Sequence, residues 1–228
     1  MTYVMSDIHG MYDKYIKMLK LIEFSDDDDM YIIGDVIDRG EHSAEVLSDM
    51  MERPNVYPVI GNHELMAMNV LDIMFNGERK KQPVSFDDML SDWIINGGLF
   101  TLESISGLSE DRRLDVLDYL SEFTNYETVD IEDRTYIMVH SGFDNFSPER
   151  KLTDYSVHEL VWHRTDPDIR YFADKDIYVI SGHTPTFGIC GEPRIIHGNG
   201  NILIDCGACF EKGKLACLCL DTMEEFYV

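Results

Sequence analysis

The sequence predicts an α/β protein, and three observations point to that class. Within the first 75 residues, a short apolar segment is followed three times by charged or polar residues and then by a helical pattern. Repeated strand–loop–helix units are typical of a largely parallel sheet covered by helices. The chain has 228 residues with 44% hydrophobic content and no repeat or linker, so we expect one domain over residues 1–228.

The first unit begins with an apolar strand at residues 3–6, and Asp7, His9 and Gly10 follow it. Residues 11–24 then place apolar side chains at a helical period. The four aspartates at 26–29 lack the alternating spacing of a calcium loop, which favours a solvated turn.

The second unit ends in the densest group of charged residues. The strand at residues 30–33 is followed by Gly34 and Asp35, then by Asp38, Arg39 and Gly40. The carboxyl ends of parallel strands are where α/β sheets build their sites. A single aspartate after a strand is often only a turn or helix-cap residue. Two carboxylates with an arginine make a functional site the better interpretation. Ser43 is a candidate N-cap for a helix to about residue 51.

The third unit has a strand at residues 56–60, after which Asn62, His63 and Glu64 open a helix to about residue 75. The pattern then changes to helices expected at 86–96, 99–106 and 109–122. We interpret residues 77–126 as a helical insertion over the site, with Gly97-Gly98 as a candidate hinge. An inert helical cap and a lid that contacts substrate are equally well supported.

The second half of the chain repeats the pattern of a strand with a polar end. A strand at 135–139 ends at His140, and a strand at 177–180 leads to His183. A short apolar segment at 157–162 precedes His163 and Arg164. Short β segments from residue 195 onward predict a final antiparallel meander.

Composition limits the partners and the compartment. The net charge is −24 with a pI of about 4.4, so we expect neither nucleic acid nor an anionic membrane as a main partner. No apolar run is long enough to span a bilayer, and the N-terminus lacks a signal sequence, which favours a cytoplasmic protein. Five cysteines, all after position 189, do not form a disulfide framework. Cys217 and Cys219 fit small core residues on one strand face better than a zinc or redox site.

Six oxygen and nitrogen donors stand at or just after the ends of five predicted strands. Such donors suit hard or borderline divalent ions, and a structural zinc site built on thiolates is excluded because no cysteine belongs to the set. The candidate ligands are Asp7, His9, Asp35, Asn62, His140 and His183.

Three motifs carry a resemblance to a known family: Asp7-Ile8-His9-Gly10, the Gly34-Asp35 to Asp38-Arg39-Gly40 segment, and Gly61-Asn62-His63-Glu64. Together they resemble the phosphoprotein phosphatase (PPP) branch of the binuclear metallophosphoesterases, closest to the small bacterial and phage serine/threonine phosphatases. The similarity runs from Asp7 to about Phe210. It implies the calcineurin-like fold, in which two mixed β-sheets pack face to face and are flanked by helices.

The resemblance also implies a role for each ligand. Asp7 and His9 would hold a first metal ion, and Asn62, His140 and His183 a second. Asp35 would bridge the two, because shared negative charge offsets the repulsion of neighbouring dications. We expect two divalent ions, with Mn²⁺ the first choice in vitro and Fe²⁺ or Zn²⁺ as alternatives.

The implied reaction is attack of a metal-bridging hydroxide on phosphorus. Arg39 and Arg164, with Asn62, would contact the phosphoryl oxygens, because the planar guanidinium matches two oxygens. Arg170 is an alternative to Arg164.

His63 is the candidate general acid for the leaving group. Two dications and a helix N-terminus both disfavour the protonated imidazole. Our hypothesis is that Asp38 orients His63 and keeps it protonated.

The leading prediction is hydrolysis of phosphoserine or phosphothreonine monoesters on proteins. The alternative is a small-molecule phosphohydrolase, such as a symmetrical diadenosine tetraphosphatase. A binding module without activity on the same fold is a third class, which the complete ligand set disfavours. The expected partner is a phosphorylated protein or a small phosphoester, and the motifs indicate no oligomeric state.

Overall fold

The first of two sheets contains the three parallel strands that the sequence predicts. In the computed structural model, described for residues 1–77 and 84–228, its strand order is β10-β9-β1-β2-β3. β1, β2 and β3 are parallel, and β9 and β10 extend the sheet antiparallel beyond β1. The strands span Thr2–Met5 (β1), Asp29–Ile33 (β2), Val56–Val59 (β3), Ala216–Cys219 (β9) and Glu225–Tyr227 (β10).

The second sheet has the order β4-β5-β6-β8-β7, with β5, β6 and β8 parallel and an antiparallel strand at each edge. Its strands span Glu127–Ile131 (β4), Arg134–Met138 (β5), Ile177–Ser181 (β6), Ile196–His197 (β7) and Asn201–Leu203 (β8). The predicted C-terminal meander is wrong. β7 and β8 join the second sheet and β9 and β10 join the first, where β9 covers the otherwise open edge of β1.

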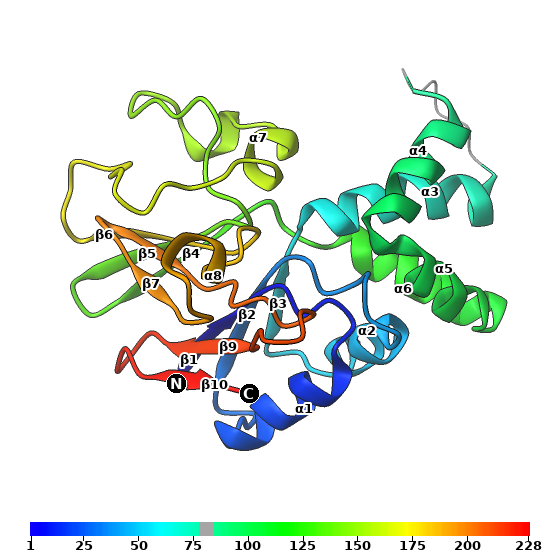
Figure 1. The fold of residues 1–228 in the computed structure, drawn as a ribbon, viewed down its shortest axis with the longest axis horizontal. Coiled ribbons are helices and arrows are strands. Elements are labelled where there is room, and N and C mark those ends of the chain that lie inside the picture. The colour runs from blue at the N-terminus through cyan, green and yellow to red at the C-terminus, as the bar shows by residue number, and fades with distance from the viewer. Residues whose placement is uncertain (78–83) are drawn as a thin grey trace.

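The two sheets pack face to face (Figure 1). Alternate residues of their strands form one buried cluster between them. Val4 and Leu218 of the first sheet share this core with Met138 and Ile180 of the second, all fully buried. Neighbouring residues such as Met5 point to the opposite face, because side chains alternate along a strand. The predicted fold class is therefore confirmed.

α1 (Tyr12–Leu21) and α2 (Ser43–Met51) pack against the outer face of the first sheet, and α3 (Asn62–Asn76) leads from β3 to the helices that follow it. Each follows one of the parallel strands, as the sequence predicts. The prediction that Ser43 caps α2 is wrong. Ser43 is the first helical residue, and its buried hydroxyl instead accepts a hydrogen bond from the backbone N–H of Asp38.

The predicted insertion contains α4 (Phe86–Trp93), a π-helix (Ile94–Gly98), α5 (Leu99–Ser106) and α6 (Glu110–Ser121). Residues 78–83 at its start lie outside the described part. α4 and α6 pack against α3, and α5 packs against α2 (Figure 1). The helix expected at 86–96 is α-helical to Trp93, and a kink at Gly97, which is left-handed with φ of 103°, then separates it from α5.

The remaining helices are short: a 3₁₀ turn at Leu152–Asp154, α7 (Val157–Val161) and α8 (Phe187–Cys190). All five cysteines are free, and Cys217 and Cys219 lie buried together on the helix-covered face of β9, as predicted. Among the described residues, no helix combines the length and apolar character needed to cross a membrane.

Candidate metal centre and active site

The loops after β1 and β2 lie against each other and carry the first ligands. The backbone N–H of Asp7 donates to the carbonyl of Gly34 (3.0 Å), and that of His9 donates to the carbonyl of Asp35 (2.9 Å). The parallel strands thus place both loops at one sheet edge. Asp7, His9 and Asp35 are each about 2% exposed, so the site lies below the surface.

The second predicted group of ligands meets Asp35 from the other sheet. His140 Nε2 lies 3.3 Å from Asp35 Oδ1 and 3.0 Å from the side-chain oxygen of Asn62. The same Asn62 oxygen lies 2.9 Å from His183 Nδ1. Asp35, His140 and His183 present ligand atoms within 4.8 Å of one another, which is a plausible cradle for one divalent ion.

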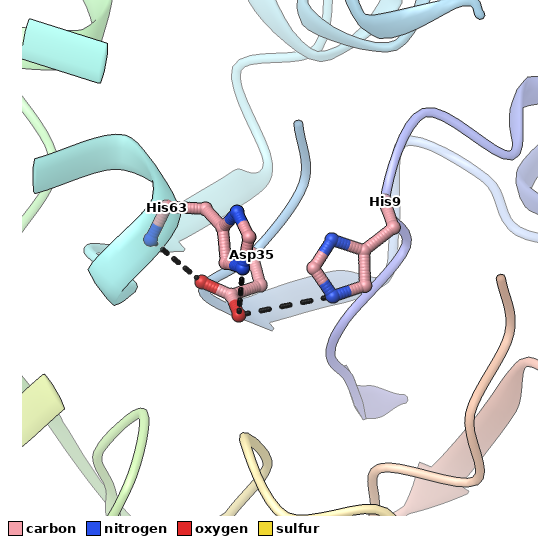
Figure 2. Close-up of side chains that lie close together, drawn as sticks. All are labelled: His9, Asp35 and His63. Carbon is pink, nitrogen blue, oxygen red and sulfur yellow. Dashed lines mark hydrogen bonds and ion pairs between the residues drawn. The ribbon is translucent and has the colours of Figure 1, made fainter. Parts of the chain in front are cut away.

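The ligand atoms predicted for the first metal ion lie farther apart than those of the second, and one residue that was not predicted as a ligand lies among them. His9 Nε2 lies 3.8 Å from Asp35 Oδ2 and 4.0 Å from Asp7 Oδ1. His63 Nε2 also lies 3.8 Å from Asp35 Oδ2, so His9, Asp35 and His63 form a second cluster (Figure 2). The geometry alone would admit His63 as a ligand. Its Nδ1 is held by Asp38 and its Nε2 lies 3.0 Å from Arg39 Nη2, so the family resemblance, and not the geometry, assigns His63 to proton donation.

Strained backbone accompanies these residues. Asp7, His9 and Asp35 have φ between 49° and 54°, and Asp38, Arg39 and His183 have φ between 64° and 71°. Non-glycine residues rarely adopt this left-handed conformation, and such strain clusters at functional sites. Six of the ten non-glycine residues with positive φ in the described chain are thus predicted site residues.

Glycines let the ligands approach one another. A Cβ on Gly61 would lie 2.3 Å from Asp35 Oδ1, and a Cβ on Gly182 would lie 2.1 Å from Asp7 Oδ2. Gly34 has φ of 84° and lets the His140 ring lie against the backbone, with a Cβ position 2.5 Å from His140 Nδ1. Nothing in the sequence around Gly182 indicates this role.

Glu64 is a buried support that the sequence analysis missed. Its carboxylate accepts hydrogen bonds from the backbone N–H groups of Asp35 (2.8 Å), Val36 (2.9 Å), Ile37 (3.3 Å) and Gly61 (2.9 Å). Burial and the charge of Asp35 raise the pKa of Glu64 to about 7, whereas the four N–H donors favour the charged form. Its position three residues after the N-cap Gly61 is that of the glutamate in a capping box, although Gly61 has no side chain to complete the box.

The crowded, buried carboxyl groups of the site show whether it suits metal ions. Burial and the neighbouring charge of Asp35 raise the pKa of Asp7 to about 7. Burial and Asp7 raise the pKa of Asp205 well above its usual range, and Asp205 is a second buried carboxyl that the sequence analysis did not assign. Carboxyl groups crowded in this way are stabilised as anions by bound cations. The donor set and its charge therefore fit two divalent ions held by the predicted ligands.

The surroundings of the candidate ligand histidines shift their pKa values in different directions. Burial opposes protonation of His140, but the adjacent charge of Asp35 raises its pKa to about 10. Burial, with the positive charge of His140, lowers the pKa of His183 to about 3, and burial lowers the pKa of His9 to about 3. Neutral His9 and His183 have the form that metal ions require, and at His140 a cation would compete with the proton.

Asp38 and His63, the predicted orienting pair, are in contact. His63 Nδ1 lies 2.7 Å from Asp38 Oδ2, and both side chains are buried. Burial lowers the pKa of His63, but the charges of Asp35 and Asp38 outweigh it and raise that pKa above its ordinary value. The same Asp38 oxygen accepts a hydrogen bond from Trp93 Nε1 at 2.8 Å, a contact that no sequence pattern indicates.

The three arginines considered for phosphate lie in different settings. Arg39 Nη1 lies 2.9 Å from His9 Nε2, and its Nη2 lies 3.0 Å from His63 Nε2. Arg164 is exposed beside His183, with one 3.4 Å hydrogen bond to Thr184. Arg170 donates to the carbonyls of Phe172, Asp174 and Ile177, which makes it a structural residue and an unsuitable substitute for Arg164.

Comparisons with known proteins agree with this geometry. Residues 2–193 match the family described as calcineurin-like phosphoesterase. The chain is 27% identical over 146 residues to serine/threonine-protein phosphatase 2 of Salmonella typhimurium, an alignment covering 64% of this chain and 60% of that protein. It is also 27% identical, over 230 aligned positions, to the asymmetrical bis(5'-nucleosyl)-tetraphosphatase PrpE of Halalkalibacterium halodurans, covering 89% of this chain and 84% of that one.

A solved structure supports the fold. The crystal structure of a putative diadenosine tetraphosphatase superposes with a TM-score of 0.68 at 16% identity, covering all of this chain and 92% of that one. The family match spans most of the chain and includes all six predicted metal ligands. On these grounds the chain belongs to the calcineurin-like phosphoesterase family.

Proposed function

We propose that the protein is a metal-dependent phosphatase that hydrolyses phosphoserine and phosphothreonine monoesters in proteins. The observation that carries the proposal is the 2.7 Å contact between His63 and Asp38 beside the metal cradle. The alkoxide leaving group of a phosphoserine is strongly basic and needs a proton. A histidine held by a buried carboxylate is the group that can supply one.

The alternative is a hydrolase of dinucleotide polyphosphates, which the similarity to PrpE over most of the chain supports. Two features favour the first proposal. A phosphate or nucleotide leaving group is much less basic than an alkoxide, so it gains little from a general acid. The net charge of −24 would also repel a polyanionic dinucleotide.

In the proposed site, Asp7, His9, Asp35, Asn62, His140 and His183 would hold two divalent ions, for which Mn²⁺ is our first expectation. Ions bound there would activate water and offset the charge of the phosphoryl group.

The positions of Arg39 and His63 suggest how a substrate would engage the site. As a donor to His63 Nε2 at 3.0 Å, Arg39 requires a neutral ring there, whereas Asp35 and Asp38 favour the protonated ring. We propose that the two arrangements alternate. Arg39 would turn to a phosphoryl group as a bidentate donor, and His63 Nε2 would then be free to carry the proton. Arg164 would contact the phosphoryl group from the other side.

The test is phosphate release by the Mn²⁺-reconstituted protein from phosphoserine and phosphothreonine peptides and from diadenosine tetraphosphate. We expect peptide turnover, and we expect His63→Asn to reduce it by about 10²–10⁴-fold, the usual contribution of general acid catalysis. His197→Asn, an exposed histidine paired with Glu225, is the matched control and should leave turnover unchanged.

The outcomes separate the two functions. A preference for the dinucleotide by orders of magnitude, with little effect of His63→Asn on its cleavage, would reject the protein phosphatase and support the alternative. Hydrolysis of neither substrate by protein with two bound Mn²⁺ ions would reject both.

A further inference from the structure

On one side, the loop that carries Asp38 and Arg39 is hydrogen-bonded to the helical insertion. The backbone N–H of Asp38 donates to Thr101 Oγ1 at 2.8 Å, and the backbone N–H of Arg39 donates to the carbonyl of Gly97 at 3.0 Å. Trp93 Nε1 donates to the Asp38 side chain at 2.8 Å. Three contacts from the insertion thus converge on two adjacent residues, both of which are in the left-handed conformation.

Trp93 fixes the direction of the Asp38 carboxylate. Asp38 Oδ2 accepts hydrogen bonds from both His63 Nδ1 and Trp93 Nε1, while Oδ1 is buried without a hydrogen-bond partner among the described residues. Both Trp93 and Asp38 are 0% exposed. The indole N–H can only donate, so it holds one oxygen in place without competing for the proton of His63.

The kink between α4 and α5, where Gly97 has a non-helical φ of 103°, allows this contact. Gly98 lies against the indole ring, and a Cβ there would be 2.5 Å from Trp93 Cε2 and Nε1. Gly97 lies against Arg39, and a Cβ there would be 2.8 Å from Arg39 Cγ and 3.1 Å from its backbone nitrogen. These close contacts disfavour Gly97-Gly98 as a hinge.

We propose that the insertion is a positioning element for the active site, in which Trp93 orients His63 through Asp38 and Gly97 sets the position of Arg39. This inference rests on the phosphatase function proposed above. It differs from both an inert cap and a lid that contacts substrate, because neither Trp93 nor Gly97 needs to touch the substrate. It gives the two residues separable effects, one on the proton donor and one on the phosphate-binding arginine.

The first test observes the Trp93 contact without substrate. The chain has two tryptophans, Trp93 and the 42%-exposed Trp162, so a ¹H–¹⁵N NMR spectrum contains two indole signals that Trp162→Phe assigns. We expect the Trp93 indole proton to exchange with solvent at least tenfold more slowly than that of Trp162. Asp38→Asn should shift the Trp93 signal and leave the Trp162 signal in place. Equal exchange rates, or an unchanged Trp93 signal in Asp38→Asn, would overturn the proposal.

The second test is kinetic. Trp93→Phe keeps an aromatic ring and removes the N–H donor. For a phosphoserine peptide we expect kcat to fall about tenfold with KM unchanged, the size expected for a lost hydrogen bond to a charged group. For p-nitrophenyl phosphate, whose leaving group needs no proton, the fall should be less than twofold. Trp162→Phe is the control. An equal fall for both substrates would indicate general structural damage and reject the positioning role.

The third test concerns Arg39. Gly97→Ala should weaken the binding of inorganic phosphate to the Mn²⁺-loaded protein by about tenfold, because bidentate arginine contacts depend on geometry. Isothermal titration calorimetry measures this without turnover. Ile95→Ala, at a side chain that is 79% exposed in the same π-helix, should leave it unchanged. Equal phosphate affinity in Gly97→Ala would reject this part of the proposal.

These readouts separate failure of the inference from failure of the proposed function. A protein that cleaves only dinucleotides would still show the protected indole proton and the weaker phosphate binding of Gly97→Ala if the insertion positions the loop. If the peptide is cleaved but the indole proton is unprotected, only the positioning role is rejected.

Discussion

Arg39 and Arg164 approach the candidate metal centre from opposite sheets, and they are anchored very differently. Both are exposed residues. Arg39, in the loop after β2, contacts His9 and His63 through its guanidinium and donates its backbone N–H to Gly97. Arg164, in the loop after α7, has one 3.4 Å hydrogen bond to Thr184. Exposure therefore says little about how well an arginine is placed for phosphate.

The backbone near Arg39 is also held by more side-chain hydrogen bonds than the backbone near Arg164. On the first-sheet side, Glu64 collects four backbone N–H groups from two loops. On the second-sheet side, Ser141 connects the loop after β5 to α7, donating to the carbonyl of Leu160 at 2.7 Å and accepting from the N–H of His163 at 2.9 Å. We therefore expect the first-sheet side to be the more rigid support and the second-sheet side to adapt more readily to a substrate.

The largest expected effect is on stability and tests this contrast directly. Glu64→Ala would leave four buried N–H donors without a partner, so we expect it to lower the free energy of unfolding by about 3 kcal/mol or more. Ser141→Ala should cost about 1 kcal/mol. Urea denaturation of both variants at equal metal content measures the difference. Similar losses in the two variants would contradict the assignment of a rigid and a loose side.

A smaller effect is expected on catalysis. Arg39→Ala should lower kcat/KM for a phosphoserine peptide by about 10²–10³-fold, because a preorganised donor to the phosphoryl group is lost. Arg164→Ala should lower it by about tenfold or less, because a freely moving side chain loses more of its binding energy to ordering. Steady-state kinetics of both Mn²⁺-loaded variants provide the measurement. A larger effect at Arg164 would reverse the comparison.

The smallest expected effect is a loss of stability at low pH on the second-sheet side. Hydrogen bonds from Arg150 and, to a smaller extent, from Ser156 lower the pKa of the Glu159 side chain, at the start of α7, from 4.5 to about 2. Because the folded-state pKa is lower than the unfolded one, these hydrogen bonds to Glu159 stabilise the fold fully above pH 4.5, and their contribution is lost as pH falls towards about 2. NMR titration of the Glu159 carboxyl should show the lowered pKa, and Arg150→Ala should raise it. An unchanged pKa in that variant would assign the shift to Ser156 instead.

The sequence was most informative where chemistry and strand ends coincide. Asp7 and Asp35 could be predicted to meet because parallel strands of one sheet deliver the residues that follow them to one edge. That His140 meets them from the second sheet was expected only from the family resemblance. The contact between Asp38 and His63 was expected from the family resemblance.

Contacts between segments that are distant in the sequence could not be predicted from strand ends or motifs. Nothing near Trp93 in the sequence indicates that its N–H reaches Asp38, and nothing near Gly182 indicates that it makes room for Asp7. The C-terminal strands alternate correctly, but a short strand carries no signal of which sheet it joins, so β8 and β9 were assigned wrongly to one meander.

The six left-handed site residues have a consequence for protein design. Each such residue costs roughly 1 kcal/mol or more, so together they approach the net stability of a typical domain, about 5–15 kcal/mol. Copying the same side chains onto regular strand ends of another scaffold would not reproduce their directions. A transplanted site would need the bent loops themselves, together with a buried carboxylate like Glu64 to hold them.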